Sequence, residues 1–156
     1  MPALPPSLKL LVCLDDQPTP YKHDPFLLTK TTHRDHYDQT RERHGAKYTP
    51  ESGDLFDVLL FNDSNQITET TISNIAMRRR TITNTHNPWI TPNLNCGLLN
   101  GVHRQRLLQQ GKIVEGVIDV DEVIKEGLEN WEVMCFNEVR HSYHVELIST
   151  NQKKIS

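Results

Sequence analysis

Lys30 is the residue whose type and position favour covalent chemistry. It follows the apolar residues 26–28, which are typical of the end of a buried strand, and precedes a polar stretch that is typical of a helix. At the edge of a core, desolvation disfavours the ammonium form and makes the amine available as a nucleophile. Most lysines at such positions instead extend their charge into water. The prediction that Lys30 is a nucleophile therefore depends on the groups that follow it in the chain.

Three polar features follow Lys30 in the sequence. Glu69 comes after a hairpin turn and leads a hydroxyl-rich stretch, whose composition suits a polar pocket better than a packed strand. Residues 99–104 contain a glycine-bearing turn before a helix, where backbone N–H groups can hold a phosphate dianion. Asn137 and Glu138 emerge from a buried strand, where a site residue would be presented.

In this order, the residues resemble the motifs of the class IV (fold-type IV) pyridoxal-phosphate enzymes. That family contains branched-chain and D-amino-acid aminotransferases and 4-amino-4-deoxychorismate lyase. Its motifs are a strand-end lysine with a polar run, T/S-E with an asparagine five residues after the glutamate, L-x-G-x-x-R, and a strand that ends in a small polar residue. Here they stand as Lys30-Thr31-Thr32-His33-Arg34, Thr68-Glu69 with Ser73-Asn74, Leu99-Asn100-Gly101-Val102-His103-Arg104, and Phe136-Asn137-Glu138. The resemblance runs from about residue 8 to residue 148.

The resemblance implies pyridoxal 5'-phosphate as the cofactor and gives each motif a role. Lys30 would be the catalytic residue, which forms the Schiff base with the cofactor aldehyde and then moves protons at the substrate's α-carbon. Glu69 would hold the pyridine nitrogen protonated. The backbone at Val102 and His103 would bind the phosphate, assisted by Asn137. Arg34 would orient the cofactor near the lysine, and the other cofactor-binding candidates are Ser73, Asn74, Leu99, Gly101 and Glu138.

A few motif positions favour one reaction within the family. Branched-chain aminotransferases carry a tyrosine five residues after the lysine, where this chain has Asp35. They also carry a threonine before the arginine of the phosphate turn, where this chain has His103. Arg34 and Asn137, which follows a cysteine-containing strand, are closer to the lyase pattern. His33 departs from this pattern, which has an asparagine at that position. We therefore expect a reaction similar to that of aminodeoxychorismate lyase, which eliminates pyruvate and gives 4-aminobenzoate for folate synthesis. A class IV aminotransferase of the branched-chain or D-amino-acid type is the alternative.

The sequence departs from the family before Lys30. Family members carry a smaller N-terminal domain there, which supplies an arginine for the cofactor phosphate, one wall of the substrate site and part of the dimer. No arginine precedes Lys30 in this chain. We therefore expect a truncated or split product, completed as a homodimer or by a separate chain with the N-terminal domain, or a catalytically silent remnant that keeps the fold. The substrate implied by the resemblance is a small amino compound.

Short strands and three helices are expected to position these residues. Apolar runs and turn residues predict strands at 8–14, 26–29, 55–61, 67–71, 74–77, 81–83, 89–90, 113–118, 131–136 and 145–148. Helices are predicted from Thr32 as N-cap to Arg43, from the turn at residues 97–101 to Gly111, and over 121–126 with Asp119 or Asp121 as cap. The pattern favours an α+β fold with a largely antiparallel sheet or pseudo-barrel. The resemblance implies the larger domain of D-amino-acid aminotransferase-like enzymes.

Composition and length exclude several classes of protein. The 156 residues allow one core, and we expect an N-terminal segment at 1–24, a cofactor-binding domain at 25–150 and a tail at 151–156. With 17 lysines and arginines against 20 acidic residues and no basic stripe, nucleic acid is not expected as a partner. No apolar run suits a membrane span, and the N-terminus lacks a signal-peptide pattern. Three widely spaced cysteines indicate reduced thiols and a cytoplasmic location. The histidine pairs at 33/36 and 141/144 lack further zinc ligands, so no metal is expected.

Overall fold

The computed structural model describes residues 9–19, 30–80 and 87–149, and for residues 30–33 it describes the backbone only. The strands in these ranges are β1 (Leu11–Leu14), β2 (Leu55–Phe61), β3 (Ile67–Thr70), β4 (Asn74–Arg79), β5 (Ile90–Pro92), β6 (Val114–Gly116), β7 (Trp131–Asn137) and β8 (His141–Ile148). The α-helices are α1 (Lys30–His44), α2 (Val102–Gln109) and α3 (Val120–Glu126), and short 3-10 helices cover Leu94–Cys96 and Leu128–Asn130.

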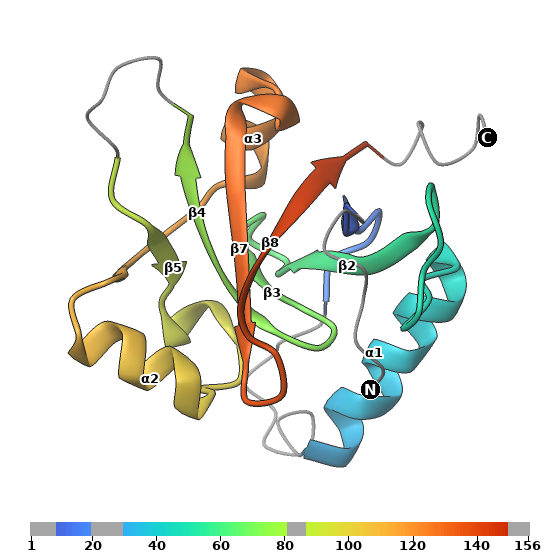
Figure 1. The fold of residues 1–156 in the computed structure, drawn as a ribbon, viewed down its shortest axis with the longest axis horizontal. Helices are drawn as coiled ribbons and strands as arrows, with labels where there is room; N and C mark the ends of the chain where they lie inside the picture. Colours follow the sequence, from blue (N-terminus) through green and yellow to red (C-terminus); the bar gives the residue numbers. More distant parts are fainter. Residues whose placement is uncertain (1–8, 20–29, 81–86, 150–156) are drawn as a thin grey trace.

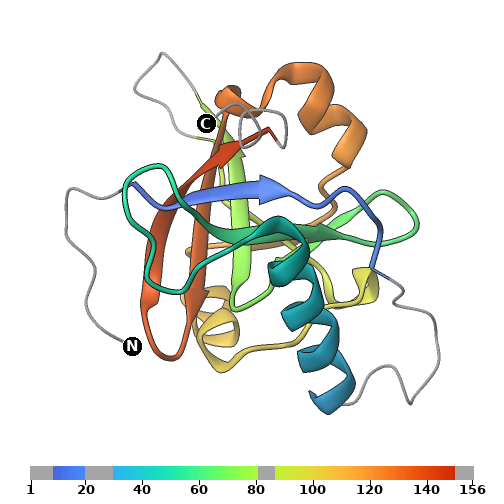
Figure 2. The same ribbon diagram turned by 90° about the vertical axis from the view of Figure 1, so that its right-hand side faces the viewer.

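The eight strands form one mixed sheet with the order β3-β2-β1-β8-β7-β4-β5-β6. β1 runs parallel to both β2 and β8, and β5 runs parallel to β6. The other four pairings are antiparallel. The sheet curls so that α1 and α2 lie at one end of the molecule and α3 lies at the other (Figures 1 and 2). The expected α+β class, with a pseudo-barrel and about three helices, is confirmed.

β2 separates two apolar clusters because its side chains alternate between the two faces of the sheet. Leu59 and Phe61 belong to the main core, together with residues of β1, β4, β7 and α3. Val58 and Leu60 face the other way and form a cluster that includes Tyr37 of α1. All seven residues of β2 are buried, as is typical of a strand covered on both faces. The first helix is thereby packed against β2 on the face opposite the main core.

Most predicted elements are confirmed, with shifted ends. β2 has the predicted bounds, whereas α1 begins at Lys30, so the prediction of Thr32 as its N-cap is wrong. A helix this polar has little apolar periodicity, so its first turn gives no clear signal in the sequence. The predicted strands at 26–29 and 81–83 lie outside the described residues. Asp119 is the cap of α3, since its carboxylate accepts a hydrogen bond from the Asp121 N–H at 2.9 Å.

Across the described ranges, every helix is too short or too polar to cross a membrane.

Candidate functional site

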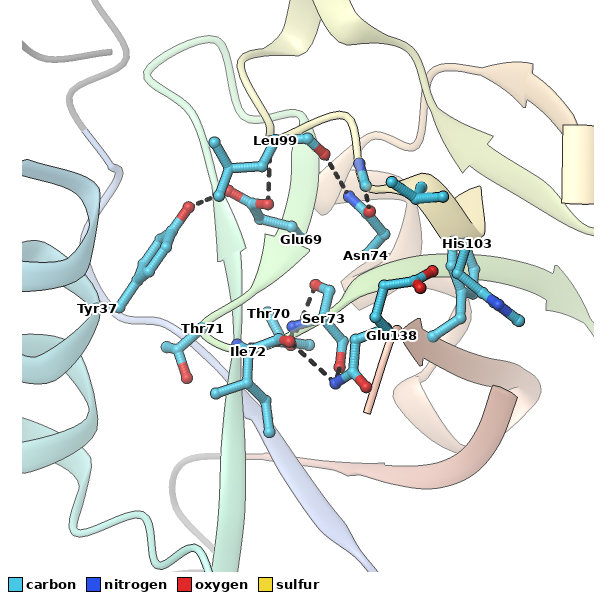
Figure 3. A pocket seen from close by; sticks show the side chains of 14 residues that line it. Tyr37, Glu69, Thr70, Thr71, Ile72, Ser73, Asn74, Leu99, His103 and Glu138 are labelled. Carbon is cyan, nitrogen blue, oxygen red and sulfur yellow. Dashed lines mark hydrogen bonds between the residues drawn. The ribbon is translucent and has the colours of Figure 1, made fainter. Parts of the chain in front are cut away.

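A pocket of about 190 Å³ opens where the end of β3, the following turn, the start of α2 and the end of β7 meet (Figure 3). Nine residues expected from the motifs line this pocket: Glu69, Ser73, Asn74, Leu99, Gly101, Val102, His103, Asn137 and Glu138. The remaining lining residues are Tyr37, Thr70, Thr71, Ile72 and Phe136. Three motifs that are distant in the sequence therefore meet in one cavity.

Glu69 places a buried carboxylate in the pocket. It shares a face of β3 with Ile67, which is in the main core, because residues two apart in a strand point the same way. Only 3% of Glu69 is exposed. The Tyr37 hydroxyl donates a hydrogen bond of 2.5 Å to Glu69 Oε2, and the Leu99 N–H donates one of 3.2 Å to Oε1. Both carboxylate oxygens are thus held by donors from other segments, as Figure 3 shows.

Asn74 shapes the turn that leads into α2. Its Nδ2 donates to the Leu99 carbonyl at 2.7 Å, and its Oδ1 accepts from the Gly101 N–H at 3.2 Å. A Cβ on Gly101 would lie 2.6 Å from Asn74 Oδ1, so the close approach requires glycine. The first N–H groups of a helix have no acceptor within the helix. The turn therefore presents the N–H groups of Val102 and His103 as donors for an anion.

Arg104, the arginine of the same motif, supports the turn from behind. It is 2% exposed and donates to Glu115 Oε2 at 2.7 Å and to the Pro92 carbonyl at 3.1 Å. Its other terminal nitrogen donates to Asn100 Oδ1 at 2.9 Å. These contacts fasten the start of α2 to β5 and β6, which places the arginine in a structural role.

Asn137 and Ser73 connect the floor of the pocket to the β7–β8 hairpin. Asn137 Nδ2 donates to Ser73 Oγ at 2.9 Å and to the Ile72 carbonyl at 3.1 Å. Ser73 Oγ also shares a 2.5 Å hydrogen bond with the Tyr143 hydroxyl. Burial is the main cause that raises the pKa of Tyr143, so the phenol stays protonated. The amide of Asn137 therefore holds the loop that carries Ser73.

His103 and Glu138 lie at the rim. The His103 ring lies against Phe136 and His141, with centroid distances of 6.2 and 5.4 Å, and its Nε2 is 3.2 Å from Ser142 Oγ. Burial, and after it the nearby His141, lower the pKa of His103, which favours its neutral form. Glu138 is about half exposed and pairs with Arg106 at 3.6 Å.

Two predicted residues stand apart from the nine. Lys30 is the first residue of α1, and its side chain lies outside what the structure describes. Arg34, one turn further along the helix, is exposed and lines an adjoining groove together with Tyr48 and Asp38. Tyr37 and Leu99 line both this groove and the pocket, so the two depressions are neighbours.

A buried ionic network beside the pocket was missed by the sequence analysis. Asp57 Oδ1 accepts from the Thr71 hydroxyl at 2.5 Å, from the Thr71 N–H at 3.2 Å and from Arg41 at 3.3 Å. Arg41 also stacks on the Tyr48 ring, with its guanidinium carbon 3.8 Å from the centroid. Burial raises the pKa of Asp57 although its partners act against this shift. An aspartate inside the apolar run of β2 is the sequence signal that could have revealed this network.

Asp15, Asp16 and His44 bring possible metal ligands within 4.8 Å of one another. Arg43 donates to Asp15 at 2.7 Å, and His44 Nε2 lies 2.9 Å from the same oxygen. Because the arginine already supplies the positive charge, this cluster is an ion-pair network. It lies outside the pocket.

The comparisons with known proteins agree with the motifs. The model of the amino-transferase class IV family matches residues 2–131. A candidate aminodeoxychorismate lyase of Schizosaccharomyces pombe is 38% identical over 128 residues, which are 81% of this chain and 50% of the relative. The aminodeoxychorismate lyase of Saccharomyces cerevisiae is 33% identical over 128 residues, which are 77% of this chain and 33% of the relative. The chain thus spans half or less of the length of these two relatives.

Among solved structures, a candidate amino-acid aminotransferase from Mesorhizobium loti superposes with a TM-score of 0.67 at 23% identity. The match covers 91% of this chain and 61% of the other chain, and it shows the fold. Together with the family match, these findings show that the chain belongs to the class IV aminotransferase family. Enzymes of this family use pyridoxal phosphate.

The residues of the pocket fit that cofactor. The protonated pyridine nitrogen of the cofactor requires a hydrogen-bond acceptor, and the buried carboxylate of Glu69 can fill this role. Its phosphate requires donors, and the turn kept open by Gly101 presents the first N–H groups of α2.

Proposed function

We propose that this chain carries out a pyridoxal-phosphate-dependent lyase reaction of the aminodeoxychorismate lyase type, in which pyruvate leaves and 4-aminobenzoate remains. The observation that carries the proposal is the meeting of a buried carboxylate, Glu69, and the N-terminus of α2 in one pocket. The two curated relatives named for this activity support the choice of reaction within the family.

Each residue of the proposal has one physical task. When bound, pyridoxal phosphate supplies an electron sink for the carbon next to the substrate amine. Lys30 would hold the cofactor through its amine and then carry the proton at that carbon. Glu69 would accept the hydrogen bond of the protonated ring nitrogen, and the N–H groups of Val102 and His103 would bind the phosphate.

The other motif residues shape the surroundings of the cofactor. Asn74, Gly101 and Leu99 would keep the phosphate turn in place, while Ser73 and Asn137 would hold the opposite loop through their mutual hydrogen bond. Glu138 at the rim and Arg34 in the adjoining groove would contact the parts of the substrate or cofactor that approach from outside.

We further propose that a second protein surface completes the site, supplied by a second copy of the chain or by a separate chain that carries the N-terminal domain. An open pocket exposes the cofactor to water, which weakens each electrostatic contact inside it. Light scattering of the purified chain, with and without cofactor, measures whether it is a dimer. A monomer that reaches full lyase activity would contradict this part of the proposal.

Titration of the purified chain with pyridoxal phosphate tests cofactor binding. We expect a visible absorption band that borohydride removes, and no such band in the Lys30→Ala variant. Release of pyruvate from aminodeoxychorismate then tests the reaction. Amino exchange with 2-oxo acids in place of pyruvate release would identify an aminotransferase, and a colourless protein in excess cofactor would identify a catalytically silent domain.

A further inference from the structure

Tyr37 contacts the proposed cofactor partner although it belongs to none of the motifs. It lies in α1 and is 8% exposed, and its hydroxyl donates to Glu69 Oε2 at 2.5 Å. Figure 3 shows this tyrosine approaching Glu69 from the helix side of the pocket. The two residues are 32 positions apart in the chain.

The hydrogen bond restrains the orientation of the carboxylate and favours its charged form. Tyr37 holds Oε2 and the Leu99 N–H holds Oε1, so rotation of the carboxylate about its terminal bond would break both contacts. Donors to a carboxylate stabilise its charged form, and hydrogen bonds to a charged group are about twice as strong as neutral ones. An ionised, fixed carboxylate is what a protonated pyridine nitrogen requires as its partner.

Tyr37 also joins the two chain segments that the proposed reaction depends on. It lies seven residues after Lys30 in α1, which is about two turns, so the two backbone positions fall on the same side of the helix. Glu69 lies on β3, which pairs with β2 under the same helix. The hydroxyl therefore connects the helix that begins at the proposed catalytic lysine with the strand that carries the proposed ring partner.

The ring and the hydroxyl of Tyr37 have separate roles. The ring packs in the cluster that contains Cys13, Leu55, Val58 and Leu60. The hydroxyl extends beyond this cluster to the pocket. A phenylalanine keeps the packing of the ring and removes the hydroxyl, so it tests the contribution of this hydroxyl group.

We propose that Tyr37 is a positioning residue for the cofactor, which acts by holding Glu69 ionised and oriented toward the ring nitrogen. The proposal rests on the proposed function, because it assigns a role toward the same cofactor. It adds a residue that the motifs do not contain.

The first test is the dissociation constant of pyridoxal phosphate, measured by absorption titration of the wild-type chain and of Tyr37→Phe. We expect Tyr37→Phe to bind about tenfold more weakly, which corresponds to the loss of one hydrogen bond to a charged group. Thr40→Val is the matched control, since it removes a buried hydroxyl of the same helix that lines neither the pocket nor the groove, and we expect its affinity to equal that of the wild type. Circular dichroism without cofactor checks that each variant is folded.

A double-mutant cycle separates positioning from a general structural effect. If Tyr37 acts through Glu69, Tyr37→Phe has no further effect on affinity in a Glu69→Ala background. The pH at which the visible band of the bound cofactor changes should also shift in Tyr37→Phe and stay the same in Thr40→Val. An equal loss of affinity in both backgrounds, or wild-type affinity in Tyr37→Phe, overturns the role of Tyr37 alone. A wild-type chain that binds no cofactor overturns the proposed function and this inference together.

Discussion

The substitution Arg104→Met tests whether the motif arginine supports the fold of the phosphate turn. Arg104 is buried, and its three hydrogen bonds link α2 to the Pro92 carbonyl, to Asn100 and to Glu115. Methionine has a similar apolar stem but no donors, so it removes the polar contacts and retains much of the packing.

The expected loss of stability follows from the fate of each acceptor. The buried Pro92 carbonyl loses its arginine donor at a cost of about 1–3 kcal/mol. Glu115 is about half exposed and can return to water, so its ion pair contributes about 0–1 kcal/mol. Asn100 is exposed as well, so water can replace the arginine at its side-chain oxygen. Arg104 Nε is buried without a partner in the described structure, and its removal offsets part of the loss. We expect a net loss of about 1–3 kcal/mol.

Guanidinium unfolding followed by tryptophan fluorescence measures this loss. For a chain of this size, it corresponds to a decrease in Tm of roughly 2–12 °C. Arg106→Met is the matched control on the same helix, because Arg106 is half exposed and its pair with Glu138 spans 3.6 Å. We expect the control to change the free energy of unfolding by less than about 0.5 kcal/mol. Equal losses in the two variants would refute a structural role for Arg104.

Three further predictions concern separate parts of the molecule. Gly101→Ala should cost about 1–3 kcal/mol and weaken cofactor binding in the titration described above, because the new Cβ displaces Asn74; unchanged affinity would contradict the close approach. Burial acts to raise the pKa of Asp15. Hydrogen bonds, first among them the one with His44, lower this pKa by more than burial raises it, so the net shift is downward. The ionised carboxylate therefore stabilises the fold above pH 3.8, its ordinary value, and this contribution is lost as the pH falls through the lower folded pKa. Asp15→Asn should reduce the free energy of unfolding at pH 7 and weaken its decrease as the pH falls below about 4. An unchanged decrease at low pH would contradict this role of the Asp15 carboxylate. Burial raises the pKa of Cys135 well above its usual range, so thiol reagents at pH 8 should modify it only as the chain unfolds, as peptide mapping would reveal; rapid labelling of the native protein would contradict its burial.

Local patterns in the sequence were sufficient to predict many of the elements, and the resemblance to the family named most of the residues that line the pocket. The apolar run at 55–61 became β2 without a shift, and the Asp119 cap begins α3. The turn at Gly101 precedes a helix as expected. Strand alternation, caps and turns depend on residues within a few positions of one another, so they can be recognised without knowledge of the fold.

The buried face of α1 could not be predicted in the same way. The polar composition of α1 predicts a surface helix with Tyr37 and few other residues turned inward, yet Arg41 and His44 are buried as well. Tyr37 donates to Glu69 and Arg41 donates to Asp57, and these two partners lie on neighbouring strands, 32 and 16 positions away. Which partner each side chain meets depends on the strand order β3-β2-β1 beneath the helix, and no local pattern encodes that order.

The sequence by itself determined the chemical groups available to this protein and their order along the chain: a lysine, a carboxylate, a glycine turn before a helix, and an asparagine after a strand. Only the tertiary structure decided which atoms meet. It committed the Asn137 amide to Ser73 and the adjacent loop, and it brought the Tyr37 hydroxyl to Glu69. The physical reason is that a buried polar group must find a partner among the groups that packing brings within reach, and packing is a property of the whole sheet.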